Sequence, residues 1–152
     1  MSMAYPDDLL EQASHLARRE RTRPRQASLR RALSTAYYAL FHLLVAEAAA
    51  NWRIQRQRAD LLRSIEHSRM RAAAARFAAS SVSAALRQVA ATFVDAQRDR
   101  QSADYDTART WSRKEAAERI EQVRTAFDAW RRVREQDAAQ DFLFAFLVKD
   151  RT

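Results

Sequence analysis

A strip of polar side chains runs through an otherwise apolar stretch in the first third of the chain. Its members are separated by four, three and four residues: Arg31, Thr35, Tyr38 and His42. This spacing places them on one face of an α-helix. Inside a buried helix, such a strip needs hydrogen-bond partners. His42 is then either a group for acid–base chemistry or a hydrogen-bonded core histidine. Tyr38 either serves the same site or packs as an aromatic whose hydroxyl finds a partner.

A second set of candidate residues lies near position 100. Arg100 and Asp104 are four residues apart, which lets them pair on one face of a helix, and Tyr105 follows directly. Arginine binds phosphate through a planar fork of N–H donors. Arg100 is therefore a candidate ligand for an anion, and the alternative is a structural ion pair with Asp104.

Histidine suits proton transfer near neutral pH, and the chain contains three histidines. His15 falls off the apolar face of its helix, so we expect it to be exposed. His67 is either part of a site or a cation at the C-terminal end of a helix, where the helix dipole favours positive charge. The sequence predicts no metal and no cofactor. It has neither cysteine nor glycine, and its clustered carboxylates alternate with arginines.

The charge of the chain favours an anionic partner. The formal net charge is +8, from 27 lysines and arginines against 19 aspartates and glutamates. Such a surplus attracts nucleic-acid phosphates and makes RNA the favoured partner. An arginine-rich surface is also typical of an ordinary solvated face. The arginines from Arg18 to Arg31 are therefore either solvated or in contact with RNA phosphates.

The composition predicts an all-α fold. Glycine is absent, only two prolines are present, and 47% of the residues are apolar. This favours helices joined by short polar corners over a sheet. A chain of 152 residues also suits a single domain spanning 1–152. We predict an antiparallel bundle of four or five helices with a short apolar helix at the C-terminus.

Apolar periodicity places the first helices of this bundle. We expect one helix over residues 5–19 and a long central helix over 27–51. The central helix carries the polar strip on one side and Leu40 in its core-facing stripe. Asn51 should end it in the left-handed conformation, in place of the glycine that the chain lacks. Trp52 should then pack back on the bundle.

The second half of the chain carries helix-end signals. A weaker helical pattern over 56–79 should break near His67. Ser80 or Ser81 should cap the next helix. Residues 112–115, with the sequence SRKE, form a capping box in which the serine and the glutamate each accept from the other's backbone N–H. This motif predicts the start of another long helix.

The last apolar stretch, FLFAFLV over residues 142–148, is too hydrophobic to be left in water. We expect the segment over 141–150 to cap the bundle or to bury itself against a second chain. A homodimer is the expected assembly. No apolar run is as long as a membrane span. Together with the absence of cysteine, this predicts a cytoplasmic protein without a membrane contact.

Two motifs resemble the HEPN superfamily of small helical bundles. The central helix carries RRALSTAYYALFH, which contains the AYYA-x-FH signature of that superfamily at residues 36–42. The segment DRQSADYD is similar to the R-x-x-A-D-Y motif at the end of the penultimate long helix, here Arg100, Ala103, Asp104 and Tyr105. The two motifs follow the order of the family, and the resemblance covers most of the chain.

The resemblance implies a dimeric bundle, often paired with a small nucleotidyltransferase in toxin–antitoxin or defence systems. Many members are metal-independent RNases. Their motif is an arginine followed after four to six residues by a histidine, repeated across the dimer interface. This chain departs from that motif. No histidine has an arginine at this offset, and Tyr105 stands in the matching place after Arg100.

The departure matters for the chemistry. Attack of the RNA 2′-hydroxyl on phosphorus is helped by a proton acceptor and donor near neutral pKa and by a cation beside the developing phosphorane charge. Tyrosine, with a reference pKa of about 10, can donate a proton at pH 7 but rarely accepts one. Another residue must then reach Arg100, and the candidates are Tyr38, His42 and His67.

The sequence thus supports two hypotheses. The first is a HEPN-like RNA-binding protein, active or degenerate as a metal-independent endoribonuclease. Its catalytic candidates are Arg100, Tyr105, Asp104 and His42, and its RNA-binding or supporting candidates are Arg31, Tyr38 and His67. The second hypothesis is a non-catalytic dimeric helical module that binds a protein partner such as a small nucleotidyltransferase.

Overall fold

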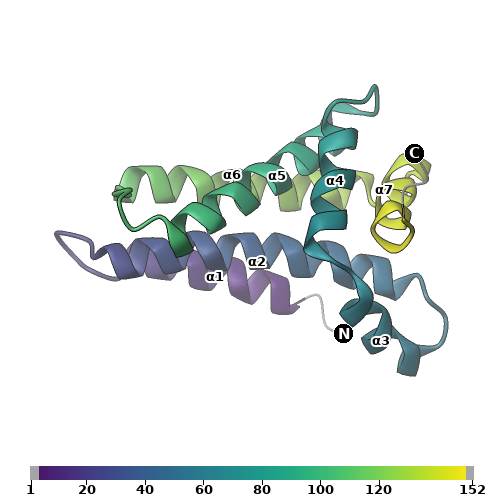
Figure 1. Ribbon diagram of the computed structural model, residues 1–152, viewed down its shortest axis with the longest axis horizontal. Helices are drawn as coiled ribbons and strands as arrows, with labels where there is room; N and C mark the ends of the chain where they lie inside the picture. Colours follow the sequence, from purple (N-terminus) through teal and green to yellow (C-terminus); the bar gives the residue numbers. More distant parts are fainter. Residues whose placement is uncertain (1–3, 150–152) are drawn as a thin grey trace.

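The computed structural model describes residues 4–149, and it confirms the all-α prediction. This part of the chain forms seven helices and no strand (Figure 1). The helices are α1 (Ala4–Ala17), α2 (Gln26–Ala50), α3 (Gln55–Ser64), α4 (His67–Ala78), α5 (Ala84–Tyr105), α6 (Arg113–Val133) and α7 (Asp137–Leu147). The break expected near His67 falls at Ile65 and Glu66, so the segment over 56–79 forms the two short helices α3 and α4.

Helix α2 is the centre of the bundle. It runs beside α1, while α5 and α6 lie against it on the other side and α4 stands across the bundle (Figure 1). The core-facing stripe of α2 is buried along its whole length: Leu29, Leu33, Tyr37, Leu40 and Leu44. These residues recur every three or four positions, as the buried face of a helix requires. The predicted core position of Leu40 is confirmed, since its side chain is fully buried.

Helix α2 is also long and apolar enough to cross a membrane, judged by length and composition alone. Most of it is buried among the other helices of the bundle. The central helix of a helical core passes the same test, because it is apolar on nearly every side. We therefore interpret α2 as a core helix.

The capping box at Ser112 is confirmed. Ser112 Oγ accepts a hydrogen bond from the backbone N–H of Glu115 at 3.0 Å, and the Glu115 carboxylate accepts one from the backbone N–H of Ser112 at 3.0 Å. The prediction for α5 was wrong by a few residues. Ser83, rather than Ser80 or Ser81, caps this helix by accepting from the N–H of Leu86.

The end of α2 differs from the prediction. Asn51 is the C-cap, but its φ of −70° is right-handed, so the expected left-handed conformation was wrong. Trp52 does not pack back on the core: its side chain is 48% exposed, and its indole N–H donates to Gln57 in the first turn of α3. The turn is closed instead by Arg58, which donates to the carbonyl oxygens of Ala50 and Trp52.

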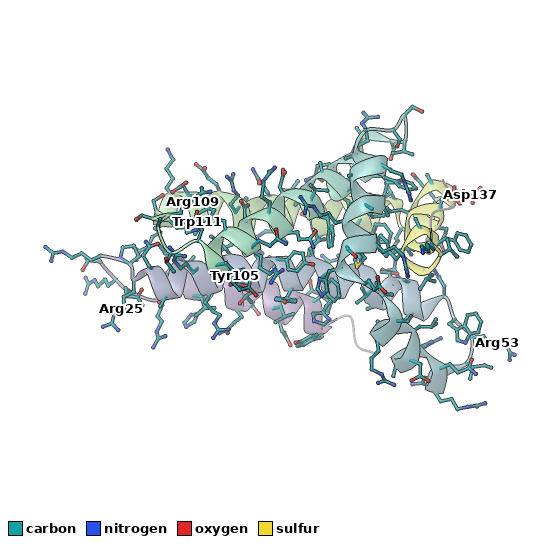
Figure 2. All side chains as sticks on the ribbon, in the orientation of Figure 1. Arg25, Arg53, Tyr105, Arg109, Trp111 and Asp137 are labelled. Atoms are coloured by element: carbon teal, nitrogen blue, oxygen red, sulfur yellow. The ribbon has the colours of Figure 1, made fainter. Side chains whose placement is uncertain are left out.

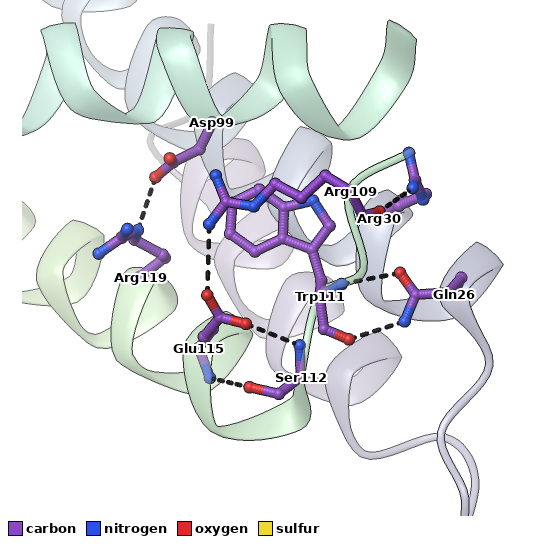
Figure 3. A network of polar contacts seen from close by, with 8 residues as sticks. All are labelled: Gln26, Arg30, Asp99, Arg109, Trp111, Ser112, Glu115 and Arg119. Atoms are coloured by element: carbon purple, nitrogen blue, oxygen red, sulfur yellow. Dashed lines mark hydrogen bonds and ion pairs between the residues drawn. The ribbon is translucent and has the colours of Figure 1, made fainter. Parts of the chain in front are cut away.

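A polar network fixes the connection between α5 and α6 on the first turn of α2 (Figure 3). The Gln26 side chain donates to the carbonyl oxygen of Trp111 at 2.7 Å and accepts from its backbone N–H at 2.9 Å. Arg30 donates to the carbonyl oxygens of Ala103 and Asp106, each at 2.9 Å. The guanidinium of Arg109 covers the Trp111 ring. These contacts hold the C-terminal half of α5, including Arg100, against α2.

Helix α7 covers the end of the bundle. It begins at Asp137, four residues before the predicted segment over 141–150, whose last residue lies outside the described part of the chain. Phe142, Leu143 and Phe146 are buried against the core, while Phe144 is 62% exposed. Most of the apolar tail is therefore covered within one chain. A dimer through α7 would add contacts mainly to Phe144.

Candidate functional site

Aromatic and histidine side chains gather where α4 begins beside the middle of α2. We define this aromatic–histidine cluster as Tyr5, Tyr37, Tyr38, Phe41, His42 and His67. Tyr5 comes from α1, His67 is the first residue of α4, and the other four lie on α2. The rings contact one another throughout. The His67 ring is stacked on that of Phe41, with centroids 4.3 Å apart and 9° between the planes.

The closest polar contact of the cluster joins Tyr37 and His67. Tyr37 Oη lies 2.6 Å from Nδ1 of His67. Burial raises the pKa of the Tyr37 hydroxyl, so this group keeps its proton at neutral pH. In the tautomer that carries its proton on Nδ1, His67 donates to Tyr37 Oη, and Nε2 keeps a free lone pair. A general base requires this form of the imidazole.

Arg100 of α5 lies beside the same two elements. Its Cζ atom is 5.3 Å from the ring centroid of Tyr37 and 5.8 Å from that of Tyr38. Its partner Asp104 is at 3.4 Å, a long contact that is confined to one terminal nitrogen. The Nε atom is buried and has no hydrogen-bond partner among the described residues. Arg100 thus keeps most of its five N–H donors unused although its side chain is only 15% exposed.

Both histidines of the cluster are held in the neutral form. Burial and then the positive charge of Arg100 lower the pKa of His67. Burial and then the charge of His67 lower the pKa of His42. His67 also stands in the first turn of α4, where the positive end of the helix disfavours a cation. The structure therefore contradicts the prediction that His67 acts as a cation at a helix C-terminus.

His42 and Tyr38 lie at the outer side of the cluster and are half-buried. The His42 ring meets the rings of Tyr5 at 5.2 Å and Phe41 at 5.3 Å, both edge-on. Within the described part of the chain, neither the His42 imidazole nor the Tyr38 hydroxyl forms a hydrogen bond. The expectation that each is a hydrogen-bonded core residue is therefore wrong. Both polar groups stay available to a ligand.

Two other candidates stand apart from the cluster. Tyr105 is 77% exposed and contacts none of the cluster rings in the described structure, so it does not replace the missing histidine. Arg31 is exposed on α2, two helical turns before Tyr38. Asp104 reaches the site only through Arg100. His15 is exposed on α1, as predicted.

The acidic residues near Arg100 pair with arginines. Asp99 accepts from Arg119 Nε at 2.9 Å across α5 and α6 (Figure 3), and Asp95 pairs with Arg98 at 2.6 Å. No group of three or more histidine, aspartate or glutamate side chains within residues 4–149 is arranged to hold a metal ion. The chemistry that the described side chains can perform is therefore proton transfer by histidine and anion binding by arginine.

Part of this arrangement is visible in the sequence. Arg100, Tyr38, His42 and His67 are all candidates from residue type and spacing, and the fold brings them together. The Tyr37 hydroxyl, which orients His67, carries no signal beyond that of a packing aromatic with some partner. Tyr5 has no signal in the sequence, since its contact with His42 depends on how α1 packs along α2.

Comparisons with known proteins leave the family open. No protein-family model, no curated protein and no solved structure matches this chain. What the molecule shows is thus a seven-helix fold over residues 4–149 with a histidine–arginine site at the junction of α2, α4 and α5.

Proposed function

We propose that this chain is a HEPN-like, RNA-directed protein that cleaves RNA without a metal ion, at the junction of α2, α4 and α5. The proposal is carried by one observation: Arg100, with most of its donors unused, lies close enough to His67 to lower its pKa, while Tyr37 holds the His67 ring. A cation and a neutral imidazole side by side are what phosphodiester transesterification uses.

The proposed reaction follows from the roles of these groups. His67 Nε2 accepts the proton of the RNA 2′-hydroxyl as its oxygen attacks the adjacent phosphorus. Arg100 donates hydrogen bonds to the non-bridging oxygens, on which negative charge grows. The bond from phosphorus to the 5′-oxygen breaks, and that oxygen leaves with a proton from water. The products are a 2′,3′-cyclic phosphate and a 5′-hydroxyl end.

The test is a cleavage assay in EDTA on end-labelled RNA. The parent should produce 2′,3′-cyclic phosphate ends, and His67→Gln should slow cleavage by about 10²-fold or more, the contribution typical of a general base. Arg100→Lys should also lose activity because lysine lacks the planar fork. His15→Gln and Arg98→Lys are matched controls, since both residues are exposed. Cleavage that persists in His67→Gln would contradict the proposal.

The non-catalytic module has one observation in its favour. The Arg100 side chain is only 15% exposed, which also suits a structural arginine between two tyrosine rings. In this second candidate function, the chain binds a protein partner such as a small nucleotidyltransferase, and the proposed homodimer provides the surface. Parent protein that neither cuts RNA nor retains it at low salt, where phosphate binding is strongest, would favour this module.

A further inference from the structure

Five arginines crowd the connection between α1 and α2. We define this basic loop as residues 18–25, which include Arg18, Arg19, Arg21, Arg23 and Arg25 against the single acid Glu20. The net charge of +4 is half of the formal charge of the whole chain, +8. All five arginines are exposed. Figures 1 and 2 show the loop projecting from one end of the bundle, with Arg25 at its base.

The acidic residue of the loop is turned inward. One carboxylate oxygen of Glu20 accepts from the backbone N–H of Arg25 at 2.8 Å, and the other accepts from the Ser28 hydroxyl at 3.0 Å. The bond from Arg25 lowers the pKa of this carboxyl, which keeps it ionised. Its ion pair with Arg19 is long, at 3.9 Å. Glu20 therefore serves the backbone of the loop and neutralises little of the outer surface.

The loop is also anchored to the bundle. Arg113 of α6 donates to the carbonyl oxygens of Ala17 and Glu20, at the start of the loop. Arg23 has a φ of +52°, a left-handed conformation that costs energy for a residue with a Cβ atom. An anchored loop loses less conformational entropy on binding than a free one.

The positions of these arginines are electrostatically unfavourable without a bound anion. Arg25 is the N-cap of α2, and the first turn of that helix has no acidic residue. Cations are destabilising at the positive end of a helix. Arg21 and Arg23 make no hydrogen bond or ion pair within the described residues. In contrast, Arg119 and Arg134, elsewhere on the surface, each pair with a carboxylate.

The geometry points to the basic loop as a second RNA-binding surface, separate from the aromatic–histidine cluster, which contacts the phosphate backbone of the bound RNA. This inference rests on the function proposed above. Arg31 continues the surface, because it is exposed on the face of α2 that leads to Tyr38 and His42. At about 1.5 Å of rise per residue, Arg25 and His42 are roughly 25 Å apart along the helix. An RNA strand that spans this length contacts both ends.

Phosphate of a nucleic acid fits the loop better than an anionic membrane does. Arginine binds phosphate oxygens with two parallel hydrogen bonds. Proteins that lie on a membrane also insert apolar side chains into it. Apart from Pro24, the loop has no apolar residue to insert.

The test measures RNA binding without cleavage. The probe is a fluorescent 2′-O-methyl oligouridylate, which lacks the nucleophilic hydroxyl, titrated at several salt concentrations. The loop variant carries Arg21→Gln, Arg23→Asn and Arg25→Gln, with asparagine chosen because it tolerates the left-handed backbone at position 23. The control variant removes three exposed arginines from the opposite end of the bundle: Arg53→Gln, Arg56→Gln and Arg132→Gln (Figure 2). Circular dichroism checks that both variants keep their helices.

The loop variant should bind more weakly than the parent. Its plot of log affinity against log salt should be shallower by about 2, since each phosphate of a single strand that an arginine no longer neutralises takes about 0.7 from the slope. The control variant should behave as the parent does. Equal weakening of both variants, or no change in the loop variant, would overturn the inference. Loop-dependent binding to phosphatidylserine vesicles in place of the probe would overturn it as well.

The two proposals can fail separately. If the parent binds the probe through the loop but natural RNA yields no cyclic phosphate ends, the catalytic proposal fails and the binding surface stands. If the parent cleaves RNA and the loop variant binds the probe with the parent's affinity, the binding surface fails and the catalytic proposal stands.

Discussion

The hydroxyl of Tyr37 lies 2.6 Å from Nδ1 of His67, so the middle of α2 is joined to the first residue of α4. Tyr37 is fully buried. Tyr37→Phe should therefore destabilise the protein by about 1 kcal/mol, the usual net value of such a hydrogen bond, and should slow cleavage because the His67 ring is no longer held. Urea denaturation measures the first effect. Tyr5→Phe is the control, since Tyr5 is 48% exposed. Equal stabilities of the two variants would mean that the contact with His67 contributes nothing.

The pair formed by Arg100 and Asp104 should contribute little to stability. Its N–O distance is 3.4 Å and it joins residues one helical turn apart, an arrangement typically worth about 0.2–0.5 kcal/mol. Asp104→Asn combined with Arg100→Lys should accordingly show a coupling energy in that range in a double-mutant cycle. A coupling above about 2 kcal/mol would identify Arg100 as a structural arginine and weaken the catalytic proposal.

Acid should destabilise the fold through its two cluster histidines. The pKa values of His42 and His67 are lowered in the folded chain, so below the ordinary histidine value of about 6.5 the unfolded chain binds more protons than the folded one. The free energy of unfolding should then fall as pH drops from about 7 to about 5.

The matched comparison is His42→Gln with His67→Gln against His15→Gln, with thermal midpoints recorded at each pH. The double variant should flatten the profile and the control should not. Asp99 acts in the opposite direction, because burial raises its pKa and protonation favours the folded state as pH falls. A profile for the double variant as steep as that of the parent would show that other groups cause the acid sensitivity.

Truncation at the centre of α2 should be costly. The Leu40 side chain is fully buried, and Leu40→Ala should lower the free energy of unfolding by about 2–5 kcal/mol through the cavity it leaves. Leu61→Ala in α3, where the side chain is half-buried, should cost clearly less. A cost below about 0.5 kcal/mol for Leu40→Ala would place this residue outside the core.

The homodimer stays a prediction, and Phe144 offers the means to test it. This side chain is 62% exposed on α7 while its neighbours Phe142 and Leu143 are buried. Light scattering should report a dimer for the parent and a shift toward monomer for Phe144→Ser. A single species of 17.6 kDa at micromolar concentration would contradict the dimer.

Local signals in the sequence predicted the helices well, because apolar periodicity and a capping box involve neighbouring residues. The cap of α5 was missed because three serines precede this helix within four positions, and only packing selects Ser83. The end at which His67 stands was also missed. A break in periodicity locates a corner but does not say on which side of it a residue will be helical.

The site was predictable as a set of residues but not as a geometry. Tyr37 and His67 are 30 residues apart, and their contact depends on the path of the chain through α3 and on the angle at which α4 crosses α2. Arg100 reaches them only because the network around Trp111 fixes the end of α5. Long-range relations of this kind leave no periodic trace in the sequence.

Helix α3 has no buried residue, and this has a consequence for how the molecule opens. Amide hydrogens in residues 55–64 should exchange with solvent through a local opening that needs far less free energy than global unfolding, and proteases should cut the chain there first. Helix α4 is anchored independently by Met70, Ala73 and Ala74, which are buried. New chain termini placed within α3 should therefore leave His67 in its position beside Tyr37.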